Sequence, residues 1–356
     1  MKRTIIAAVL MITSAFSMGM PGSTDLLEIH GFNQVRFTMW GREKSDPSSG
    51  FDLYNQMRFD PRITGLFSAH LMFETRYGFF TYDTLTSATY DDDFTFRLRD
   101  AFLTMEFAPE LVLTGGRFRL PFGYAFYRDG SRIPFYGRTM ASGDEEFLAF
   151  GGYDVGAMLS TDFGPIVINL AYTNGTDSHA DTTVKKQFTA DIGAVPVPWA
   201  RLGAAVAIVG QPELEDQDSW SATGLDFYVY GERPVFGRLS AAYTAEYMIL
   251  PWRGPAVDNM ENGSGSDLAI TLSGKYTDQI GILSAVEPAV RFEVLTPAYQ
   301  IQAGASKPEE GRSSLDVCLN LHSGDENVIQ IGTRSFGFQQ DIDGYTNVYI
   351  NWRMVF

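Results

Sequence analysis

The sequence contains a single cysteine, Cys318, so the chain cannot form an intramolecular disulfide. It also has few charged residues, 20% of the chain, and among them 43 acidic residues outnumber 27 basic ones. The formal charge of -16 argues against a nucleic-acid partner, because binding phosphates requires a basic surface.

Histidines are also scarce, with only four in the chain. His322 precedes Ser323, but adjacent residues of a strand point to opposite faces and cannot act together as base and nucleophile. The acidic runs at residues 91–93 and 213–218 lack the spacing and glycine of a dedicated calcium loop, and we expect them on solvated loops. We therefore expect no enzymatic activity, no cofactor and no metal site.

Long apolar runs are absent after the first 20 residues. The chain begins MKRTIIAAVLMITSAFSMGM, in which Lys2 and Arg3 precede an apolar stretch, and Ala15 and Ser17 have the spacing of a signal-peptidase site. This pattern predicts a secretory signal peptide at residues 1–19 rather than a retained helix, which would need about 20 apolar residues. The remainder, residues 20–356, shows no linker or long repeat and is predicted to be one domain that could cross a membrane only as strands.

The last residues, YTNVYINWRMVF, alternate between two faces. Val348, Ile350, Trp352, Met354 and Phe356 share one face, and mostly polar residues share the other. One row can therefore contact hydrocarbon while the other contacts water, as the wall of a transmembrane barrel requires. A terminal Phe on such a strand resembles the end of bacterial outer-membrane barrels, so we expect an outer-membrane protein in contact with lipid and lipopolysaccharide.

Similar alternation recurs along the chain and predicts an all-β, antiparallel transmembrane barrel of about sixteen strands. The predicted strands are residues 28–40, 51–64, 69–82, 94–107, 111–122, 151–161, 166–174, 186–195, 200–210, 221–231, 236–249, 267–277, 281–295, 313–322, 327–338 and 345–356. Tight connections, such as those near Gly65, Pro109, Gly164, Pro196 and Pro234, alternate with long polar ones. A soluble β-sandwich would instead show shorter strands and uniformly short loops.

Four arginines lie close together in the fourth and fifth predicted strands: Arg97, Arg99, Arg117 and Arg119. Their alternation with Phe and Leu predicts that all four point into the lumen, with Arg99 and Arg119 as near cross-strand neighbours about a turn at Pro109. Because like charges opposite one another are destabilising, something must offset them. Permeating anions could do so. Internal pairing is the alternative, with candidate partners at Asp100, Glu106, Asp129, Asp144, Glu145 and Glu146.

The longest connection follows Arg119 and runs to about Phe150. It carries Arg128, Arg132 and Arg138 among several aromatic residues, too many for a surface loop. We expect this third external loop to fold inward and to narrow the pore, with an external lid or partner-binding loop as the alternative.

The segments RLRDAFLTMEFAPELVLTGGRFRLPFGY, AYTNG and VEPAVRFEVL resemble the phosphate-selective porin O and P family. The resemblance implies sixteen strands, a homotrimer and the passage of small anions such as phosphate. The chain departs from the family in one respect, because its long loop contains no lysine whereas the phosphate-selective members use loop lysines at the narrowest ring. A non-selective porin and a plugged receptor or adhesion barrel remain the alternative functions.

Overall fold

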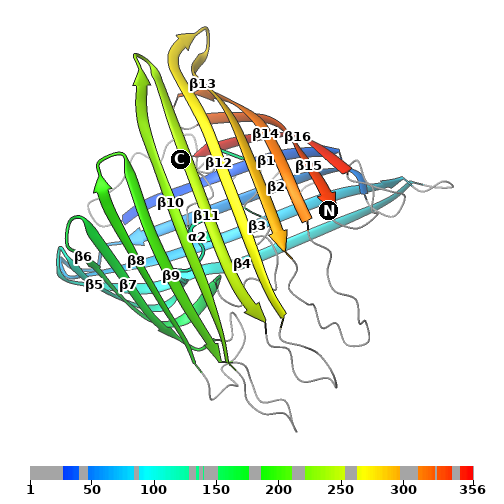
Figure 1. The fold of residues 1–356 in the computed structure, drawn as a ribbon. Helices are drawn as coiled ribbons and strands as arrows, with labels where there is room; N and C mark the ends of the chain where they lie inside the picture. The colour runs from blue at the N-terminus through cyan, green and yellow to red at the C-terminus, as the bar shows by residue number, and fades with distance from the viewer. Residues whose placement is uncertain are drawn as a thin grey trace.

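The computed structural model describes residues 27–39, 47–83, 88–127, 134–135, 139, 151–175, 186–210, 221–252, 263–296, 312–324, 327–338 and 345–355. Within these ranges the chain forms sixteen antiparallel strands that close into a single barrel (Figure 1). The structure therefore confirms the predicted all-β fold and the predicted strand number. No helix among the described residues is long and apolar enough to span a bilayer.

The first half of the barrel consists of β1 (Leu27–Met39), β2 (Pro47–Pro61), β3 (Phe67–Asp83), β4 (Ala88–Ala108), β5 (Leu111–Arg119), β6 (Tyr153–Asp162), β7 (Ile166–Thr173) and β8 (Gln187–Val197). The second half consists of β9 (Ala200–Gly210), β10 (Ser221–Phe236), β11 (Leu239–Trp252), β12 (Gly263–Ile280), β13 (Leu283–Thr296), β14 (Arg312–Ser323), β15 (Asn327–Phe338) and β16 (Tyr345–Val355). A short helix, α2 (Tyr124–Tyr127), lies in the β5–β6 connection.

Each strand pairs with its sequence neighbours, and β1 pairs with β16 to close the ring. Short turns join β2 to β3, β4 to β5 and the later even–odd pairs, so they gather at one end of the barrel, which we call the short-turn end. One prediction was wrong in detail. The strand β4 begins at Ala88, so the acidic run 91–93, expected on a loop, belongs to this long strand.

The two faces of the wall differ sharply in polarity. Large apolar side chains stand exposed on the outer face, including Phe96 (61% exposed) and Ile350 (51%), as contact with lipid requires. The intervening residues face the interior and are mostly polar, with Glu246, Gln330 and Asn351 at most 2% exposed. The final strand follows the predicted alternation, although Phe356 itself lies outside the described residues, as does the predicted signal peptide at 1–19.

Tyrosines lie across glycines on neighbouring strands of this wall. Gly203 is opposite Tyr228, and Gly332 is opposite Tyr349. A Cβ atom at Gly203 would come within 2.3 Å of the Tyr228 ring, and one at Gly332 within 2.5 Å of the Tyr349 hydroxyl. Glycine therefore leaves the space that each tyrosine ring occupies.

This packing gives a first prediction. We expect Gly203→Ala to destabilise the barrel by about 1–3 kcal/mol, because the Tyr228 ring must move to accommodate the new methyl group. The measurement is the unfolding temperature of the purified protein in detergent. Gly274→Ala is the matched control, since the nearest atoms to a Cβ there are 4.0 Å away. Equal effects of the two substitutions would contradict this account.

Candidate functional site

The connection between β5 and β6 enters the interior of the barrel. The backbone N–H of Tyr124 donates to Asp226 Oδ2 at 3.2 Å, and that of Ala125 donates to both carboxylate oxygens of Glu246, at 3.1 and 3.2 Å. Both carboxylates belong to the buried, inward-facing rows of β10 and β11. They hold the start of α2 against the inner wall.

Aromatic stacking reinforces this attachment. The Tyr124 ring stacks on Tyr230 with a centroid distance of 4.3 Å and on Tyr228 at 5.2 Å. The Tyr228 hydroxyl in turn donates to Asp191 at 2.8 Å. The position of α2 thus depends on β8, β10 and β11 together.

A second attachment lies further along the same connection. The side-chain amide of Gln330 donates to the Pro134 carbonyl at 3.0 Å. Phe135 is buried against Ala289, Cys318 and Tyr349, with the Arg291 guanidinium 5.0 Å from its ring centroid. The described parts of the connection therefore contact inward-facing residues of β10 and β11 at α2 and residues of β13 to β16 at Pro134 and Phe135.

Three of the predicted arginines surround one aromatic ring where β5 leaves the wall. The guanidinium carbons of Arg99, Arg117 and Arg119 lie 5.2, 5.9 and 5.0 Å from the Tyr153 ring centroid. Arg119 donates to the Tyr153 hydroxyl and, at 3.1 Å, to the Tyr127 carbonyl, so it also fixes the end of α2. We call Arg99, Arg117, Arg119 and Tyr153 the arginine cluster.

Strand register explains why the arginines meet. The β4–β5 hairpin turns at Pro109, and Ala101 lies opposite Arg117, which places Arg99 at the level of Arg119. Arg117 Nε donates to the Arg99 carbonyl at 3.0 Å. Arg97 is exposed and lies opposite Glu74 in the β3–β4 register. Residues Arg128, Arg132 and Arg138 lie outside the described part of the chain.

The acidic partner of the cluster is one that the sequence did not suggest. Arg99 forms a bidentate ion pair with Glu74, with nitrogen–oxygen distances of 2.9 and 2.7 Å. Tyr54 donates a further hydrogen bond to the same carboxylate, at 2.5 Å. Asp100, which was a candidate partner, instead lies 3.5 Å from His70. Candidates Asp129, Asp144, Glu145 and Glu146 lie outside the described residues.

Acidic side chains dominate the wall to which the β5–β6 connection attaches. Asp226, Glu246, Asp267, Glu293 and Asp316 occupy inward positions on the five consecutive strands β10 to β14. The last two also pair with arginines, since Arg334 contacts both Glu293 and Asp316 and Arg291 contacts Asp316. The interior of the barrel thus has the arginine cluster beside β5 and mainly acidic groups along β10 to β14. No group of His, Cys, Asp and Glu residues with the arrangement of a metal site occurs in the described ranges.

No protein-family model matches the chain, and no curated protein matches it. Solved structures do match over the whole barrel. OmpF of Salmonella typhi, solved with daunomycin, has a TM-score of 0.60 at 13% identity, covering 93% of this chain and 97% of that one. The anion-selective porin from Comamonas acidovorans gives 0.57 at 11% identity, covering 93% and 99%. The trimer form of OmpT from Vibrio cholerae gives 0.52 at 12% identity, with the same coverage of 93% and 99%. These likenesses show that the chain has the sixteen-stranded fold of outer-membrane porins.

Proposed function

We propose that this protein is an outer-membrane porin that lets small hydrophilic solutes diffuse through a water-filled channel and prefers anions such as phosphate. The observation that supports the preference is the arginine cluster beside α2, where we expect the β5–β6 connection to narrow the pore. Guanidinium groups stay charged at every physiological pH and bind phosphate or carboxylate oxygens through pairs of N–H donors. Two of the three arginines, Arg117 and Arg119, have the strand backbone and the neutral Tyr153 and Tyr127 among their contacts.

Single-channel recording tests this proposal. The purified protein in a planar bilayer should conduct, and its reversal potential in a salt gradient should indicate anion preference. Added phosphate should lower the chloride current if the cluster holds it during passage. A barrel that inserts without conducting would support a plugged receptor instead.

A non-selective porin is the second candidate, and two observations favour it. The Arg99 charge is offset by Glu74, and the opposite wall carries the acidic residues of β10 to β14. These acids could attract cations into the same opening and cancel the effect of the arginines. A reversal potential close to zero would support this function.

The outer-membrane location leads to a second prediction. The protein should fractionate with outer membranes and should run faster on a denaturing gel before boiling than after, because a closed barrel has no free edge from which to unravel. Recovery as a soluble protein with a single gel position would contradict this location.

Association gives a third prediction. The resemblance to trimeric porins, together with the OmpT trimer among the matching folds, supports a homotrimer built through the apolar outer face. Cross-linking in native membranes should therefore yield dimers and trimers. If cross-linking yields only the monomer, the proposed trimer is contradicted and the channel proposal still stands.

A further inference from the structure

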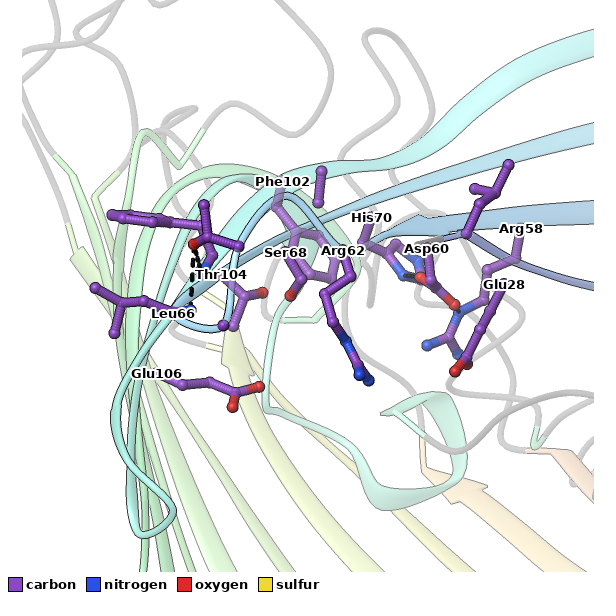
Figure 2. A pocket seen from close by; sticks show the side chains of 15 residues that line it. Glu28, Arg58, Asp60, Arg62, Leu66, Ser68, His70, Phe102, Thr104 and Glu106 are labelled. Carbon is purple, nitrogen blue, oxygen red and sulfur yellow. Dashed lines mark hydrogen bonds and ion pairs between the residues drawn. The ribbon is translucent and has the colours of Figure 1, made fainter. Parts of the chain in front are cut away.

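Two adjoining cavities open inside the barrel between α2 and the short-turn end. The larger measures about 640 Å³ and reaches Tyr127, and the smaller measures about 470 Å³ and reaches the β2–β3 turn at Thr64–Leu66. They share Arg58, His70 and Phe102, which Figure 2 labels in the lining of the smaller cavity. A solute that has passed α2 would therefore meet both cavities before it leaves. Cavities of this size hold small organic molecules.

One part of the larger cavity's lining is apolar, whereas the wall of a water-filled lumen is normally polar. Phe32, Phe118, Met72 and Met158 line it and are each at most 8% exposed, and Phe102 joins them. Phe118 and Met158 belong to a packed apolar cluster on the inner face. Water forms no hydrogen bonds with such a surface, whereas burying an aromatic ring or an alkyl group against it is favourable.

A cationic group stands beside this apolar surface. Arg58 donates through Nε to Asp60 at 2.6 Å, and its side chain is 48% exposed to the interior. Among the described residues, no partner holds the two terminal amino groups of Arg58. They can therefore donate hydrogen bonds to a carboxylate in the paired geometry that guanidinium favours.

Buried groups behind Phe102 fix its position in the cavity. His70 stacks on Phe102 with a centroid distance of 4.5 Å and contacts Asp60 at 2.6 Å. Asp100 lies 3.5 Å from His70 with a side chain that is 90% buried. The Oδ1 atom of Asp100 is itself buried, so Asp100 belongs to the supporting wall and does not contact a solute.

We infer that this cavity is a binding site for a small aromatic carboxylate. The carboxylate binds Arg58, and the ring lies among Phe102 and its apolar neighbours. This inference rests on the proposed function, because the site lies on the route of a permeating anion, and it specifies the class of anion that is retained longest.

Equilibrium binding to the purified protein in detergent tests the site without requiring conduction. Benzoate should bind more tightly than acetate or glucose. Arg58→Gln should weaken benzoate binding by about 10-fold or more, the usual effect of losing a charge-assisted hydrogen bond. Phe102→Leu should weaken benzoate binding more than acetate binding. Arg233→Gln, near the β10–β11 turn, is the matched control and should have no effect.

The outcomes separate this site from the channel itself. An anion-preferring channel that binds acetate and benzoate equally, or glucose more tightly, would overturn the site and leave the proposed function standing. Tight binding of benzoate to a barrel that does not conduct would support the site and contradict the proposed channel. Folding of each variant is checked by its gel position before boiling. If Arg58→Gln does not fold, the affinities of benzoate, acetate and glucose for the unaltered protein and for the Phe102→Leu variant decide the question.

Discussion

Replacing Arg117 and Arg119 together with glutamate should move the reversal potential from anion preference to cation preference. The two substitutions change the local charge by four units beside Tyr153, where the β5–β6 connection begins. Coulomb's law gives about 0.5 kcal/mol for two unit charges about 8 Å apart in water, so the change for a passing ion is about 2 kcal/mol before screening. The anion-to-cation permeability ratio should fall by about 10-fold or more.

The overall charge of -16 does not oppose this expectation, because ion selectivity depends on the electric field of the charges nearest to the passing ion. Charges further than about 8 Å from the solute are screened at physiological salt, whereas a narrow passage concentrates the field of the nearest groups. Arg233→Glu with Arg238→Glu is the matched control, since both residues lie near the β10–β11 turn at the short-turn end. If the control shifts selectivity as far as the cluster does, or if the cluster reversal leaves it unmoved in a folded barrel, the arginines are structural and the non-selective porin is correct.

Strand number and strand positions could be predicted from the sequence because the two faces of a barrel wall impose period-two alternation. This alternation is clear in β11, where Leu239 and Tyr247 are exposed and Glu246 is buried. The β4–β5 hairpin was also predictable, because its turn at Pro109 fixes the register that brings Arg99 level with Arg119. The extended start of β4 was missed, since consecutive aspartates at residues 91–93 favour a loop when only local composition is considered.

The contacts that organise the interior were not predictable. Glu74 pairs with Arg99 from 25 residues away, and Asp226 holds Tyr124 across 102 residues. Which inward carboxylate meets which partner depends on strand register around the ring and on the path of the β5–β6 connection, and neither is set by local sequence. The segment VEPAVRFEVL, which resembles the porin O and P family, contains Arg291 and Glu293. Both residues belong to the ion-pair network of the inner wall.

Neutralising the two carboxylates that hold α2 should widen the channel. In the variant Asp226→Asn with Glu246→Gln, the backbone N–H groups of Tyr124 and Ala125 lose their carboxylate acceptors. A hydrogen bond contributes about 0.5–1.5 kcal/mol net, so the attachment of α2 to the wall should weaken by about 1–3 kcal/mol. We expect single-channel conductance to rise and current noise to increase, because the connection leaves the wall for part of the time.

The strands themselves should survive this change, since every strand pairs with both neighbours through its backbone. Glu232→Gln with Asp278→Asn is the matched control, because neither carboxylate contacts α2. Glu232, on β10, accepts a hydrogen bond from Ser240, and Asp278, on β12, pairs with Arg238. Tyr124→Leu provides an independent variant, since it removes the stacking on Tyr228 and Tyr230 and keeps both carboxylates. Both α2 variants should raise conductance and the control should not. If neither does so in folded barrels, the β5–β6 connection does not limit the flow of ions, and the width of the channel is set by the wall alone.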